Sequence, residues 1–141
     1  MNLPRSRWYL ILIGIGLVSL MGCTTVQVKN PQDSLLPRVQ KLAQAKIRGD
    51  WATVYSLLAP SSKRRLPEAA FVNRKRGIQF KTFKIKDIHL APSQKEAVVK
   101  VLWEISMGGY DFKNAPELQS WVYVDGTWYL KMKKPTNPFK N

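Results

Sequence analysis

The sequence predicts an α+β domain in which three N-terminal helices pack on a four-stranded antiparallel sheet. Apolar residues recur at three- and four-residue spacing before Gly77 and alternate with polar residues beyond it. Asp125-Gly126 separates two alternating segments, and this dipeptide is a strong short signal for a β-hairpin. A chain of 141 residues is expected to form one domain.

The first helix is expected to begin at Asp33 or Ser34, because either side chain can accept hydrogen bonds from the free amides of a first helical turn. Gly49 suits the left-handed position that follows the C-terminus of a helix. The apolar residues between these ends fall on one face of the helix, and they are Leu35, Leu36, Val39, Leu42, Ala43 and Ile47.

Two shorter helices are expected to follow. Asp50 is placed to cap the first of them, and Pro60 stops it. Residues 61–65 are expected to form a polar turn, after which Pro67 and Glu68 begin the next helix. The residues that these two helices direct inward are Trp51, Val54, Tyr55, Leu58, Ala70 and Phe71.

The first strand is expected over residues 80–90. Its apolar residues change phase between Ile85 and Ile88, which predicts a β-bulge near Lys86-Asp87. After a turn, a second strand runs until Gly108-Gly109 breaks it. Its inward residues alternate cleanly, and they are Ala97, Val99, Val101, Trp103 and Ile105.

The last two strands are expected over residues 118–124 and 127–132, on either side of the Asp125-Gly126 turn. In an antiparallel hairpin with a two-residue turn, Tyr123 pairs with Trp128 and Trp121 pairs with Leu130 on a shared face.

The first 22 residues have the parts of a bacterial export signal. Arg5 and Arg7 form a short positive segment, and residues 8–21 form an uncharged apolar run. At about 14 residues this run is short for a bilayer-spanning helix, which needs roughly 20. An uncleaved N-terminal anchor is the alternative interpretation.

Leu20-Met21-Gly22-Cys23 resembles the lipobox of bacterial lipoproteins, although Met21 replaces the small or β-branched residue usual at its position. The resemblance implies that the Cys23 thiol takes a diacylglyceryl group and that signal peptidase II, which recognises Leu20, Gly22 and Cys23, cuts before Cys23. Mature proteins of this class carry two or three fatty-acyl chains, such as palmitate, which gives stable membrane anchoring. Thr24, rather than Asp, after the cysteine favours the outer membrane in a Gram-negative organism.

The expected organisation is therefore a signal peptide over residues 1–22, a lipidated tether over 23–33, a folded domain over 34–134 and a loose tail over 135–141. We expect the protein in the cell envelope, facing the periplasm if the organism has an outer membrane.

The charge balance is strongly basic. The chain has 23 Lys and Arg against 9 Asp and Glu, and removal of Arg5 and Arg7 with the leader leaves a net charge of +12. Such a surplus favours an anionic partner: anionic lipid, lipopolysaccharide or cell-wall polymer. Export makes nucleic acid an unexpected partner. The single cysteine excludes an internal disulfide.

Several local patterns resemble the nuclear transport factor 2-like (cystatin-like) superfamily over most of residues 34–134. They are Arg48-Gly49-Asp50-Trp51, Tyr55, Leu57-Leu58, Pro60, Phe71, Trp121, Tyr123, Asp125-Gly126 and Trp128-Tyr129. The resemblance implies a curved sheet that encloses a cone-shaped cavity with the helices. Some relatives, such as ketosteroid isomerases and polyketide cyclases, use an Asp or His in the cone as a general base. Proteins of this fold often dimerise through the sheet, so a homodimer is a candidate assembly.

The acid–base candidates in the mature chain are few. His89 is the single histidine, and Asp87 lies two positions before it. Lysines surround this strand, and we expect His89 at a rim rather than in a catalytic role, with Glu104 on the solvent side of the sheet. The sequence holds no metal-ligand spacing, and lipidation consumes Cys23, so we expect no catalytic residue, metal or cofactor. The aromatic residues of helices and strands are expected mainly in the core.

Basic residues cluster around the third predicted helix. They are Lys63, Arg64, Arg65, Arg74, Lys75 and Arg76. This cluster is a candidate anion-binding patch, and an ordinary solvated face is the alternative.

The sequence thus favours a non-enzymatic, outer-membrane-anchored lipoprotein that acts as a binding or envelope-assembly module. A carrier of small apolar ligands and, less favoured, an isomerase or cyclase-type enzyme are the alternatives.

Overall fold

The computed structural model describes residues 30–73 and 77–132 as four helices followed by one four-stranded sheet. Of the described helices, none is long and apolar enough to cross a membrane. The elements in chain order are α1 (Pro31–Arg48), α2 (Trp51–Ser56), α3 (Pro60–Lys63), α4 (Glu68–Asn73), β1 (Ile78–Leu90), β2 (Glu96–Met107), β3 (Tyr110–Val124) and β4 (Thr127–Lys131).

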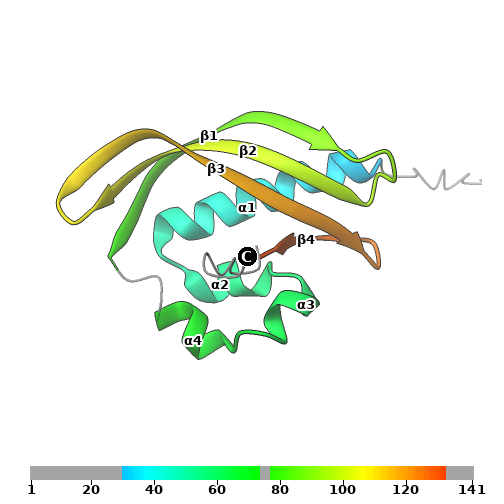
Figure 1. Ribbon diagram of the computed structural model, residues 1–141, viewed down its shortest axis with the longest axis horizontal. Helices are drawn as coiled ribbons and strands as arrows, with labels where there is room; N and C mark the ends of the chain where they lie inside the picture. The colour runs from blue at the N-terminus through cyan, green and yellow to red at the C-terminus, as the bar shows by residue number, and fades with distance from the viewer. Residues whose placement is uncertain (1–29, 74–76, 133–141) are drawn as a thin grey trace, which may run out of the picture.

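The sheet is an antiparallel meander with the strand order β1-β2-β3-β4. It curves over α1, and α2, α3 and α4 lie below on the same side, so the helices cover the concave face (Figure 1). The predicted α+β class, with helices that precede an antiparallel sheet, is confirmed.

Helix α1 begins at Pro31, earlier than the predicted start at Asp33 or Ser34. The Asn30 side chain accepts a hydrogen bond from the backbone N–H of Gln32 at 3.2 Å. Asn followed by Pro is a favourable beginning for a helix, because proline lacks the amide that a first turn leaves free. This signal was present within the segment expected to be a tether.

The other end of α1 agrees with the sequence prediction. Gly49 has a φ of 69°, which suits glycine because a side chain there would be strained. The Asp50 carboxylate accepts a hydrogen bond from the backbone N–H of Thr53 at 3.0 Å and caps α2. Leu36, by contrast, was predicted inward but is 40% exposed.

Pro60 begins a helix rather than ending one. Helix α2 already ends at Ser56, and Pro60 is the first residue of the single turn α3, where a polar turn was predicted. The intervening chain adds to the sheet, since Ala59 N–H donates to Leu130 O and Leu130 N–H donates to Leu57 O, each at 2.9 Å. The described part of the chain therefore has one helix more than predicted.

Strand β1 contains two register irregularities. The predicted one lies between Ile85 and Asp87 and is confirmed, and a second lies between Phe80 and Thr82. Each extra residue shifts the side-chain phase and bends the strand. As a result Phe80, Phe83, Ile85, Ile88 and Leu90 all pack against the core although they do not alternate strictly.

Strand β3 begins at Tyr110, eight residues before its predicted start at residue 118. Its first half contains Asn114, with a φ of 55°, and Pro116, which are both unusual within a strand. The hairpin that follows has the predicted pairs of Tyr123 with Trp128 and Trp121 with Leu130.

The core lies between α1 and the concave face of the sheet. Its largest fully buried side chains include Trp121 and Trp128. Trp128 also ties β4 to α1, because its indole N–H donates to Pro31 O at 2.7 Å and its backbone O accepts from the Arg38 side chain at 2.9 Å. Among the residues that the structure describes, the buried apolar ones all lie between Leu35 and Trp128.

Candidate functional site

The predicted lipidation residues lie outside the part of the chain that the structure describes. These residues are Leu20, Gly22 and Cys23. The basic cluster is only partly described, since Arg74, Lys75 and Arg76 also fall outside. Of the three described residues of the cluster, Arg64 and Arg65 are exposed. The third is Lys63, whose ammonium donates a hydrogen bond to Ser56 O at 2.9 Å. The same ammonium lies 5.5 Å from the centre of the Tyr55 ring.

Asp87 and His89 lie on the face of the sheet that points away from the helices. Both side chains are exposed, and the residues between and beyond them, Ile88 and Leu90, pack against the core. In a strand, successive side chains point to opposite faces, so neither Asp87 nor His89 points into the space between sheet and helices.

We expect His89→Ala and Asp87→Asn to leave cellular function unchanged and to alter the free energy of unfolding by about 1 kcal/mol or less, because both side chains are exposed. Complementation of a deletion strain, with thermal unfolding of the purified variants, provides the measurement. Loss of function in a variant that folds and localises normally would instead support an enzyme.

A cavity of about 360 Å³ lies between the concave face of the sheet and helices α1, α2 and α4. One wall is apolar and the other contains the only described charged pair inside the fold. The lining residues are Lys46, Trp51, Val54, Leu58, Phe71, Pro116, Glu117, Leu118, Gln119, Leu130, Lys131 and Met132. The lining thus combines apolar and polar surface in nearly equal parts, and a concave site with convergent polar groups is a candidate for small-molecule binding.

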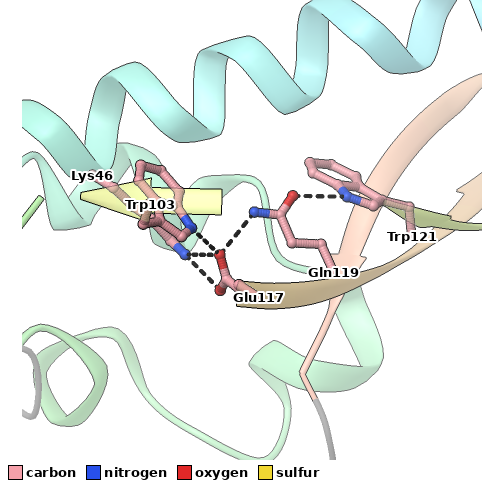
Figure 2. Close-up of polar contacts among 5 residues, drawn as sticks. All are labelled: Lys46, Trp103, Glu117, Gln119 and Trp121. Atoms are coloured by element: carbon pink, nitrogen blue, oxygen red, sulfur yellow. Dashed lines mark hydrogen bonds and ion pairs between the residues drawn. The ribbon is translucent and has the colours of Figure 1, made fainter. Parts of the chain in front are cut away.

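The polar wall is a network centred on the Glu117 carboxylate (Figure 2). The Lys46 ammonium donates to both carboxylate oxygens, at 2.7 Å to Oε1 and 2.9 Å to Oε2. Oε2 also accepts from the Trp103 indole N–H at 2.8 Å and from the Gln119 amide at 3.0 Å. The Trp121 indole N–H donates to the Gln119 carbonyl oxygen at 3.3 Å. Because tryptophan only donates and a carboxylate only accepts, these partners fix the orientation of the Gln119 amide.

Sequence periodicity explains how α1 and β3 position this network. Lys46 continues the buried stripe of Leu35, Val39 and Leu42 at four-, three- and four-residue spacing. Glu117 lies four residues before the inward Trp121, so two-residue alternation places it on the same concave face. Both residues were missed, Lys46 because a lysine on a buried stripe is rare and Glu117 because its segment was not recognised as a strand.

Two opposing effects act on the ionisation of Glu117. Burial raises its pKa, while the Lys46 charge and the hydrogen bonds from Lys46, Gln119 and Trp103 lower the pKa by more, so it lies below its usual value near 4.5. Lys46 in turn lies 5.1 Å from the centres of the Phe80 and Trp103 rings, whose faces attract a cation. Glu117 is therefore a carboxylate at neutral pH.

Glu117 is poorly suited to act as a general base. A general base needs a pKa near the working pH, whereas three side chains stabilise Glu117 as a carboxylate. Across residues 30–73 and 77–132, no three His, Cys, Asp or Glu side chains gather as a metal site.

The fold is similar to several solved structures. A SEC-C motif containing protein from Rhodopseudomonas palustris matches with 14% identity and a TM-score of 0.54, over 71% of this chain and 84% of that one. A SEC-C motif containing protein from Psychrobacter arcticus matches with 15% identity and a TM-score of 0.58, over 74% of this chain and 60% of that one. An NTF2-like protein from Cytophaga hutchinsonii matches with 23% identity and a TM-score of 0.51, over 70% of this chain and 91% of that one.

No protein-family model and no curated relative matches the chain. The structural likeness establishes the fold, which is α+β and nuclear transport factor 2-like, as the sequence resemblance implied.

Proposed function

We propose that the protein is a lipid-anchored, non-enzymatic binding module of the cell envelope that takes a small ligand into the cone-shaped cavity. The observation that carries this proposal is the cavity of about 360 Å³, whose apolar wall faces a charge pair that is already neutralised. Trp51 and Phe71 supply aromatic surface to the apolar wall, which suits a ring-shaped or aliphatic body.

The location is part of the proposal. The lipobox-like ending at Cys23 and Thr24 after it favour the outer membrane, with the domain facing the periplasm. Seven Lys and Arg of the mature chain lie outside the described residues, with no acidic residue among them, whereas residues 30–73 and 77–132 carry 14 Lys and Arg against 9 Asp and Glu. This surplus supports anionic lipid, lipopolysaccharide or cell-wall polymer as a neighbour.

Blocking the cavity should abolish ligand uptake. Met132 lines the cavity and is half-buried at the end of β4, so Met132→Trp fills space there with little overpacking. We expect the neutral fluorescent probe N-phenyl-1-naphthylamine to bind the mature chain carrying Cys23→Ser. Met132→Trp should weaken this binding at least about tenfold, which is about 1.4 kcal/mol.

Val98→Trp is the matched control, because it adds the same ring on the opposite face of the sheet, where Val98 is 41% exposed. Equal probe affinity in both variants, measured by fluorescence titration, would contradict binding in the cone.

A further inference from the structure

The polar groups of the cavity wall are unequally accessible. Trp103, Gln119 and Lys46 are 2%, 3% and 8% exposed, while the Glu117 side chain is 35% exposed. Glu117 is therefore the most accessible polar side chain of this network for a molecule in the cavity. Lys131 also lines the cavity and is more exposed, but its ammonium pairs with Glu96 at 3.2 Å.

The two oxygens of Glu117 are also unequal. Oε2 accepts from Lys46, Trp103 and Gln119, whereas Oε1 accepts from Lys46 alone within the described ranges. In Figure 2 Oε1 points away from Trp103 and Gln119. A carboxylate has about four lone-pair positions, so Oε1 retains capacity for another donor while Oε2 does not.

We infer that the cavity selects a neutral ligand with an apolar body and one hydroxyl or amide N–H group, which donates a hydrogen bond to Glu117 Oε1. This inference rests on the proposed function of the cone. An anionic head group has no hydrogen to donate to the Glu117 carboxylate, so it gains no hydrogen bond at Oε1 and binds less well. A ligand without a donor would displace water from Oε1 and make no hydrogen bond in its place. The affinity of such a ligand is therefore lower.

Three naphthalene derivatives separate these classes at nearly constant size. They are 2-naphthol, which has a hydroxyl donor, 2-methoxynaphthalene, which has no donor, and 2-naphthoate, which is an anion. We expect the mature chain carrying Cys23→Ser to bind 2-naphthol at least about tenfold more tightly than 2-methoxynaphthalene, because hydrogen bonds to charged groups are strong. We expect 2-naphthoate to bind most weakly. Titration by nuclear magnetic resonance, with the indole N–H signal of Trp103 as the local reporter, locates the binding and measures the affinities.

The variant test is Glu117→Gln, with Glu104→Gln on the outer face as the matched control. Should Glu117→Gln fail to fold, Lys46→Met/Glu117→Met removes both charges together and keeps an apolar wall. In either variant the preference for 2-naphthol is expected to fall to about twofold or less, whereas Glu104→Gln retains it.

The outcomes distinguish this inference from the proposed function. Three results would overturn the inference and leave the cone as a binding site. They are equal affinity for 2-naphthol and 2-methoxynaphthalene, tighter binding of 2-naphthoate than of 2-naphthol, and a preference for 2-naphthol that survives in the Glu117 variants. Absence of all three compounds from the cavity would overturn both.

Discussion

Glu117→Gln is expected to lower the free energy of unfolding by about 3 kcal/mol. The change leaves the Lys46 ammonium, whose side chain is 9% exposed, without its carboxylate partner. Removing one partner of a buried ion pair typically costs about 3–5 kcal/mol, and the lower end applies because a third of the Glu117 side chain is exposed. Urea unfolding of a chain that begins at residue 23, followed by tryptophan fluorescence, measures the loss.

A double-mutant cycle of Lys46→Met, Glu117→Met and Lys46→Met/Glu117→Met measures the interaction energy between the two side chains. The double variant is expected to recover most of the stability that either single change loses, because apolar residues of similar volume often replace a buried ion pair without loss. Glu104→Gln, on the opposite face of the sheet, should change stability by about 0.5 kcal/mol or less. Additive effects of the two single changes would show that Lys46 and Glu117 do not stabilise each other.

The ion pair of Lys46 and Glu117 makes the free energy of unfolding depend on pH. The pKa of Glu117 is lower in the folded protein than its usual value near 4.5, which the unfolded chain has. The contribution of Glu117 to the free energy of unfolding is therefore complete above about pH 4.5. It is lost as the pH falls through the pKa that Glu117 has in the folded protein. Glu117→Gln should lack this part of the acid dependence. A remainder is expected from Asp50 and Asp111, whose pKa values are lowered by hydrogen bonds from Thr53 and Lys81 respectively.

The sequence predicts the sheet well where side chains alternate and a turn has a defined chemistry. Strand β2 alternates from Glu96 to Trp103. Asp125-Gly126 has positive φ at both positions, 48° and 79°, as the predicted turn requires, so the register of the hairpin could be derived. The first residues of the helices were harder to predict. A proline, such as Pro31 or Pro60, can stand in the first turn of a helix or can mark the place where a helix ends.

The candidate site could be predicted only in part. Periodicity alone places Lys46 on the buried stripe of α1, and alternation from Trp121 places Glu117 on the concave face. Their meeting across 71 positions depends on the bulges of the sheet and on the rotation of α1 over it. Of these features, only the bulge near Lys86-Asp87 is visible in a local pattern, and the sequence directed attention to His89 and Asp87 on the other face.

Cys23→Ala is expected to remove the protein from the membrane fraction almost completely. Alanine has no thiol to receive a diacylglyceryl group, and each buried methylene of a lipid chain contributes about 0.8 kcal/mol to membrane binding. The variant should therefore be released from its lipid anchor, or should keep its leader uncleaved. A high-salt wash of the membranes is needed before fractionation, because exposed charges are screened beyond about 3 Å at 1 M salt and the basic surface is then detached.

Mass spectrometry of the detergent-extracted wild-type protein is expected to show an acylated Cys23 as the N-terminal residue. Arg64→Glu/Arg65→Glu is the matched control: it reverses two exposed charges, keeps Cys23 and should remain in the washed membranes. If the wild-type protein begins at Met1 with an unmodified Cys23, it is not a lipoprotein. Retention of Cys23→Ala with a cleaved leader after the wash would show that a contact other than the lipid and the salt-sensitive basic surface holds the domain.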